Sequence, residues 1–225
     1  MNALAIAVAA ATSLAAVVAC RSTRPVVSAP PAAPTVDAPA ALPVPEVELP
    51  AGAAVLLVVD RSGSMQGAKL EAARAAMAAA IAAMPDGAPF GVIAFDSSAS
   101  EPVVLAAVGD RSTLGAAIAG IEAGGGTDLV AAMRVAHARL RTAPGPVRHI
   151  VLLSDGESAY DGVEELVTGL AADGISVSAV AIGDADLQLL RLISDGTRGR
   201  LYANVELGTL PAIYVREVEH TLAAR

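Results

Sequence analysis

The sequence predicts an α/β protein with a doubly wound, mostly parallel sheet, helices on both faces and one short antiparallel edge strand. From Ala51 onward, apolar runs alternate with amphipathic helical stretches, which is typical of consecutive βαβ units. The first run, Val55–Val59, is unbroken and rich in β-branched residues, as expected for a strand buried on both faces. Polar residues follow several runs directly, at the strand ends where open α/β sheets bind ligands.

The expected elements can be read in order along residues 51–225. Strands are predicted at Val55–Val59, Phe90–Phe95, Pro102–Val108, Val147–Leu153, Ile175–Ile182 and Arg200–Ala203, the third at an antiparallel edge. Helices are predicted at Ala68–Met84, Arg111–Ile121, Leu129–Arg141, Asp161–Ala172, Asp186–Ser194 and Gly208–Leu222. Pro211 falls in the first turn of the last helix, where proline is tolerated.

Composition narrows the class of protein. The chain has 225 residues, which favours one domain with a tail. Aromatic residues make up only 2% of it, so the core must be built from Ala, Val, Leu and Ile. The formal net charge of -8 argues against a nucleic-acid-binding protein, which needs a basic surface. With a single cysteine, Cys20, no disulfide can form within the chain.

The N-terminal 20 residues have the features of an export or anchoring segment. Residues 3–19 are almost all Ala, Val, Leu and Ile, which fits the apolar core of a signal peptide. The run ends in VVAC and resembles a bacterial lipobox, which implies that cleavage leaves Cys20 as a lipidated N-terminus. A plain signal peptide, an uncleaved membrane anchor and a buried structural segment are the alternatives.

Residues 21–50 are rich in proline, alanine and valine. Proline fixes φ and removes a backbone donor, so neither a helix nor a central strand is expected there. The segment is predicted to be a disordered, extended linker between residues 1–20 and a folded domain at residues 51–225.

Oxygen-bearing side chains occur where three of the predicted elements meet the same edge of the sheet. They are Asp60, Ser62 and Ser64 after the first strand, Thr127 in a glycine-rich loop, and Asp155 after the fourth strand. Right-handed crossovers bring the carboxyl ends of parallel strands to one edge, so the five could meet at one point. Hard cations such as Mg²⁺ prefer oxygen ligands, and the set therefore predicts a metal site.

Taken singly, these residues also fit structural roles. Ser or Asp at the end of a strand can cap the next helix, as can Thr127 or Asp128, and Asp155 can begin a turn. Three further acidic residues lie near the same edge, Asp96, Asp128 and Glu157. Each is expected to cap a helix or to lie in a solvated loop. The coincidence of five oxygen donors at one edge favours the metal site.

Three motifs in this order, DRSGSM at 60–65, GGGTD at 124–128 and LSDGE at 153–157, resemble the von Willebrand factor A domain. The resemblance covers residues 51–225 and implies a Rossmann-like fold with a metal-ion-dependent adhesion site. Bacterial membrane-associated members look similar around AFD at 94–96 and LPAIYVRE at 210–217.

The resemblance also implies a mode of metal binding. The hydroxyls of Ser62 and Ser64 would coordinate Mg²⁺ directly, Thr127 directly or through water, and Asp60 and Asp155 mostly through water. Mn²⁺ or Ca²⁺ could take the place of Mg²⁺. Neutral hydroxyl ligands leave the ion much of its positive charge, so an acidic side chain of a protein partner is expected to complete the shell.

These expectations describe a bacterial cell-envelope protein that is held at the membrane by its N-terminal lipid or anchor and binds another protein. The alternative is a scaffold or assembly subunit that works with a MoxR-type AAA+ ATPase. Because such an ATPase is cytosolic, export of this chain would exclude direct contact with it.

The sequence gives little support for an enzyme. No GxSxG nucleophile elbow is present, and no P-loop lysine follows the glycines at 124–126. A Mg²⁺-dependent phosphoryl-transfer enzyme is the strongest enzymatic alternative, but Ser62 stands where such a site would carry its second carboxylate. The three histidines fall within predicted elements, and His149 is expected to be a packed or edge residue of its strand.

Overall fold

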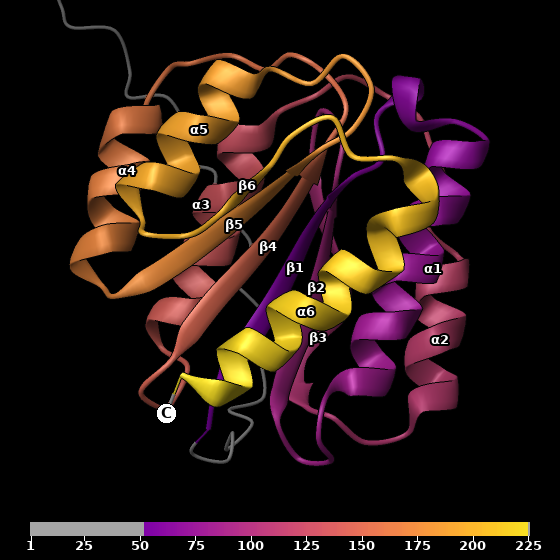
Figure 1. The fold of residues 1–225 in the computed structure, drawn as a ribbon, viewed down its shortest axis with the longest axis vertical. Coiled ribbons are helices and arrows are strands. Elements are labelled where there is room, and N and C mark those ends of the chain that lie inside the picture. The colour runs from indigo at the N-terminus through magenta and orange to yellow at the C-terminus, as the bar shows by residue number, and fades with distance from the viewer. Residues whose placement is uncertain (1–51, 225) are drawn as a thin grey trace, which may run out of the picture. The chain divides into compact units, whose positions relative to one another are not determined.

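The structure of the protein is a computed structural model that describes residues 52–224. These residues form a six-stranded sheet with the order β3-β2-β1-β4-β5-β6 (Figure 1). All neighbouring strands pair in parallel except β2 and β3, which are antiparallel. The predicted fold class is therefore confirmed. The predictions for residues 1–20, Cys20 and residues 21–50 lie outside the described residues.

The elements lie close to their predicted positions. The strands are β1 (Ala54–Asp60), β2 (Pro89–Phe95), β3 (Ala99–Ala107), β4 (Arg148–Ser154), β5 (Ile175–Ala181) and β6 (Leu201–Tyr202). The α-helices are α1 (Ala68–Ala83), α2 (Arg111–Ala119), α3 (Leu129–Arg141), α4 (Val163–Ala172), α5 (Leu187–Gly196) and α6 (Leu210–Ala223). Two short 3₁₀ turns, η1 (Gly63–Met65) and η2 (Leu207–Thr209), precede α1 and α6.

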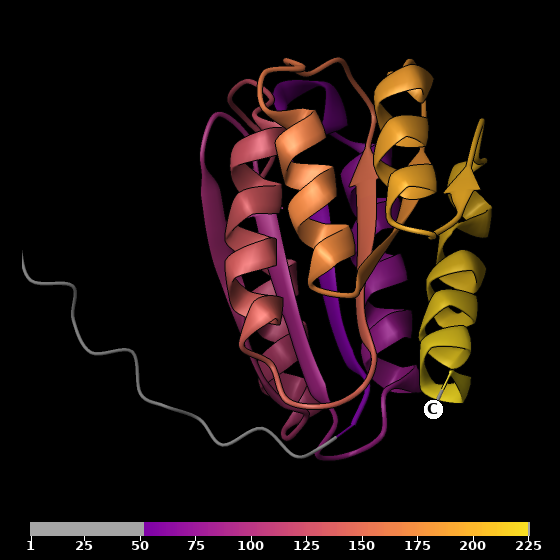
Figure 2. The same cartoon turned by 90° about the vertical axis from the view of Figure 1, so that its left-hand side faces the viewer.

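The sheet separates two apolar cores, and Figure 2 shows α3 and α4 on one side of it and α1 and α6 on the other. Alternate residues of β1 supply the two cores, because successive side chains of a strand point to opposite faces. Val55, Leu57 and Val59 belong to the core under α1 and α6. Leu56 and Val58 belong to the core under α3, α4 and α5. All five are fully buried, which explains the unbroken apolar run.

The edge strand β3 differs from its prediction. It begins at Ala99 and spans nine residues, whereas a short strand starting at Pro102 was expected. Ser100 pairs with Ala94 of β2, so the polar residues ahead of Pro102 already belong to the ladder. An edge strand with one exposed face carries such residues readily, and they interrupt the apolar pattern by which strands are recognised.

A buried ionic cluster fastens α6 to the sheet. Glu217 of α6 is fully buried and accepts hydrogen bonds from Arg200 (3.0 Å) and from the Tyr202 hydroxyl (2.5 Å). Its Oε2 also lies 3.0 Å from Nε2 of His149 on β4, whose other ring nitrogen lies 2.7 Å from the Ser176 hydroxyl. Of the two roles expected for His149, a packed or an edge residue of its strand, the structure shows the packed one, since His149 is buried on the inner strand β4. This cluster joins α6 to β4, β5 and β6.

Candidate metal site

Asp60 ends β1 and fixes the start of the loop that follows. Its side chain is fully buried, and Oδ1 accepts a hydrogen bond from the backbone N–H of Ser62 at 2.8 Å. Oδ2 accepts a hydrogen bond from the Ser154 hydroxyl at the end of β4, at 3.1 Å. One carboxylate thus connects the ends of the two central strands and directs the chain into the η1 turn.

A chain of hydrogen bonds joins the two serines to the second carboxylate. The Ser62 and Ser64 hydroxyl oxygens are 3.0 Å apart, and the Ser64 hydroxyl donates to Asp155 Oδ1 at 2.7 Å. The Asp155 side chain is fully buried. Four of the five predicted residues, which lie up to 95 positions apart in the sequence, therefore lie together at the carboxyl ends of β1 and β4.

The glycine-rich loop brings Thr127 to the same edge. The backbone N–H of Gly63 donates to the Gly125 carbonyl at 3.1 Å, and the N–H of Gly124 donates to the Arg61 carbonyl at 2.8 Å. Gly125 has a positive φ of 77°, and a Cβ at this position would lie 3.0 Å from the Asp96 side chain. Thr127 is connected to the other four residues by the backbone of this loop. Within residues 52–224, its side chain forms no hydrogen bond with any of the four.

Two of the three neighbouring acidic residues have structural roles. Asp128 caps α3, because its carboxylate accepts a hydrogen bond from the N–H of Ala131 at 3.0 Å, as expected. Asp96 forms an ion pair with Arg61 at 2.6 Å, a partner that the sequence did not indicate. Glu157 is exposed in the loop after β4.

Lys69 is the site residue that the sequence analysis missed. It lies in the first turn of α1, and its Nζ is 2.5 Å from Asp155 Oδ2. Its side chain is 30% exposed, so the ammonium group sits at the rim of the site. One signal could have drawn attention to it, because Lys69 is the only lysine in the sequence.

The donor set fits a hard divalent cation. The four hydrogen-bonded side chains and Thr127 offer only oxygen atoms, as Mg²⁺ and Ca²⁺ prefer. Burial raises the pKa of Asp60, and the charge of Asp155 adds to this effect while hydrogen bonds from Ser62 and Ser154 oppose it. Within residues 52–224, no three His, Cys, Asp or Glu side chains cluster to hold a metal, so a cation at this edge would depend on the hydroxyls.

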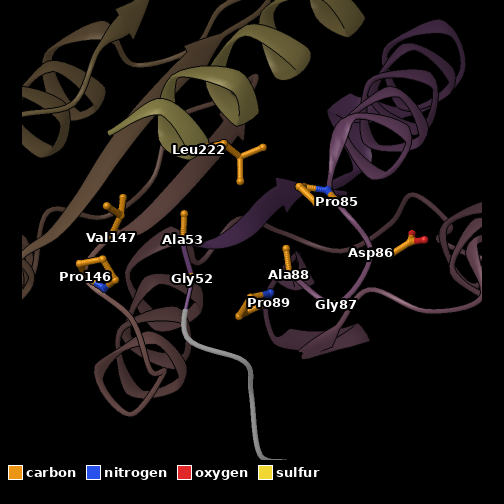
Figure 3. A pocket seen from close by; sticks show the side chains of 10 residues that line it. All are labelled: Gly52, Ala53, Pro85, Asp86, Gly87, Ala88, Pro89, Pro146, Val147 and Leu222. Atoms are coloured by element: carbon orange, nitrogen blue, oxygen red, sulfur yellow. The ribbon is translucent and has the colours of Figure 1, made fainter. Parts of the chain in front are cut away.

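A separate apolar pocket of about 420 Å³ lies at the opposite end of β1 (Figure 3). Gly52 and Ala53, which lead into β1, line it together with Leu222 near the end of α6. Both ends of the described chain therefore meet at the amino end of the central strand. The candidate metal site lies at the other end of that strand.

This fold and these motifs define a protein class. The family model of the von Willebrand factor type A domain matches residues 54–215, and the chain belongs to this family. No curated protein matches the sequence. Among residues 52–224, none of the helices combines the length and the apolar character needed to span a bilayer.

Solved structures show the same fold. A von Willebrand factor type A protein from Catenulispora acidiphila has a TM-score of 0.71 and 24% identity, covering 76% of this chain and 43% of that one. The conserved hypothetical protein BatB from Bacteroides thetaiotaomicron has a TM-score of 0.64 and 19% identity, covering 77% and 100%. Proximal thread matrix protein 1 from the mussel byssus, with a zinc-occupied MIDAS motif, has a TM-score of 0.62 and 21% identity, covering 77% and 46%.

Proposed function

We propose that this protein is a cell-envelope von Willebrand factor A protein that binds a protein partner through a divalent cation, Mg²⁺ in the first place. Asp60, Ser62, Ser64, Thr127 and Asp155 would hold the ion, and a carboxylate of the partner would complete its shell. The observation that carries the proposal is the hydrogen-bonded group of two serine hydroxyls and two buried carboxylates at the ends of β1 and β4.

The structural relatives support a metal-dependent binding role. The mussel byssus protein holds zinc at a MIDAS motif, and another relative is the vWF domain of a pili tip protein, Mfa5, from Porphyromonas gingivalis, with a TM-score of 0.65 and 12% identity. In this chain, Mn²⁺ or Ca²⁺ could replace Mg²⁺, because the donors are all oxygen atoms. We propose that this protein acts by binding a partner and does not catalyse a reaction.

Removing one of the side chains that would hold the metal should abolish Mg²⁺ binding without unfolding the protein. Asp60→Ala and Ser62→Ala leave the apolar core unchanged, so a folded chain without a metal site is expected. Asp60→Ala should also lower the stability, because it leaves the Ser62 N–H and the Ser154 hydroxyl without their acceptor. Calorimetry should show Mg²⁺ binding to wild type and to neither of these two variants. A free Mg²⁺ concentration of 100 times Kd should stabilise wild type by about 2.7 kcal/mol.

The matched controls are exposed residues of the same types, Ser112→Ala and Asp195→Ala. Both should bind Mg²⁺ like wild type. A partner captured from envelope extracts should be lost with Asp60→Ala and in EDTA. Equal capture under either condition would contradict a metal-dependent interface and assign binding to another surface.

We further propose that residues 1–20 direct export, that Cys20 becomes the lipidated N-terminus, and that residues 21–50 link it to the domain. The support is the apolar run that ends in VVAC and the proline-rich stretch that follows. Mass spectrometry of the protein from membranes should find a mature chain that begins with acylated Cys20. An intact Met1 terminus or a free Cys20 thiol would contradict lipidation.

A further inference from the structure

The only lysine of the chain lies at the candidate metal site. The other 14 of the 15 lysine and arginine residues are arginines. The remaining ion pairs to Asp or Glu among the described residues use arginine or histidine, for example Arg139 with Glu101 and Arg61 with Asp96. A lysine ammonium is a compact point charge, whereas an arginine guanidinium is a broad planar fork. At this site the buried Asp155 carboxylate is therefore paired with an ammonium group, the smaller of the two side-chain cations.

The surroundings fit this ammonium group closely. Asp155 Oδ1 accepts a hydrogen bond from the Ser64 hydroxyl at 2.7 Å, and Oδ2 accepts one from Lys69 Nζ at 2.5 Å, so both carboxylate oxygens have protein partners. Gly183, in the loop after β5, leaves space for the Lys69 ammonium group, because a Cβ at this position would lie 2.9 Å from Nζ. Elements far apart in the sequence thus meet around one positive charge.

We propose that Lys69 makes metal binding at this site depend on an acidic ligand. The inference rests on the proposed function and follows from the charges. The Lys69 ammonium offsets Asp155, which leaves Asp60 as the one uncompensated carboxylate of the five-residue set. A divalent cation then gives the site a net positive charge, and an anion is needed to balance it.

The position of the ion pair makes this effect large enough to measure. Asp155 is fully buried and Lys69 is only 30% exposed, so water screens their charges less than it screens a surface pair. The ammonium repels an incoming cation and attracts an incoming carboxylate. Because coupling between two ligands is reciprocal, the acid tightens the metal by the same factor by which the metal tightens the acid.

Neutral and charge-conserving variants separate these effects. Lys69→Gln keeps a donor for Asp155 without the charge, and it should bind Mg²⁺ about ten times more tightly than wild type by calorimetry in chloride. Replacing chloride by acetate at equal ionic strength should tighten Mg²⁺ binding to wild type, and this gain should fall by at least about threefold in Lys69→Gln. Lys69→Arg, which keeps the charge, should retain the acetate effect.

Arg191→Gln, on the exposed side of α5, removes one positive charge outside the site and controls for net charge. It should behave like wild type, and circular dichroism should show that all variants are folded. Equal Mg²⁺ affinity and equal acetate effects in wild type and Lys69→Gln would overturn the inference and leave the metal site standing. No Mg²⁺ binding by any of the proteins would instead overturn the proposed function on which the inference rests.

Discussion

Val58→Asp is expected to leave the chain unfolded at neutral pH. Val58 is fully buried in the central strand β1, within the core under α3, α4 and α5. The substitution places a carboxylate there without a partner, and the expected loss of stability exceeds about 4 kcal/mol. Circular dichroism should show the loss of secondary structure, and urea unfolding should show no cooperative transition.

Val104→Asp is the matched control, because Val104 on the edge strand β3 is 50% exposed. This variant should fold and lose less than about 1 kcal/mol, since a surface carboxylate stays hydrated. A Val58→Asp chain that unfolds cooperatively near the wild-type urea midpoint would show that β1 does not lie at the centre of the sheet.

Acid should destabilise the protein through Glu217. Burial alone would raise the pKa of this carboxyl, but hydrogen bonds from His149, Ser178 and Tyr202 outweigh it and lower the pKa to about 2 from the ordinary value of 4.5. The unfolded chain thus takes up a proton before the folded chain does. The resulting stability is present in full above about pH 4.5 and is lost as the pH falls toward 2, a loss of roughly 3 kcal/mol.

Glu217→Gln isolates this contribution. Urea unfolding between pH 7 and pH 2 should show the variant well below wild type at neutral pH and close to it at the acid end, because both side chains are then uncharged. Glu219→Gln, at an exposed position of the same helix, should follow the wild-type profile. A constant difference between Glu217→Gln and wild type across this pH range would rule out the ionised carboxylate as the source.

Most of the fold could be predicted because its strands are buried runs and its helices are amphipathic. The apolar run Val55–Val59 predicts a strand covered on both faces, since it contains no polar side chain. The start of β3 could not be predicted from the same rule, because Ser100 and Glu101 lie on an edge strand. There, pairing with β2, and not apolar content, decides the structure.

The part of the candidate metal site that lies in short sequence motifs could be predicted from the sequence. Asp60, Ser62 and Ser64 form one motif, and parallel topology brings Asp155 to them. The contact of Lys69 with Asp155 joins residues 86 positions apart, and a lysine in the first turn of a helix gives no local sign of it. The same holds for Glu217 of α6 and His149 of β4, which are 68 positions apart.

The direction of β1 has a mechanical consequence. The chain ahead of Gly52 joins the amino end of this strand, and the candidate metal site follows its carboxyl end. A pull between that chain and a ligand held at Ser62 and Ser64 would run lengthwise along β1. Its ladders with β2 and β4 would then be loaded in shear, with hydrogen bonds on both sides strained together and not unzipped one after another. The strand that presents the site is thus also the one best placed to carry tension.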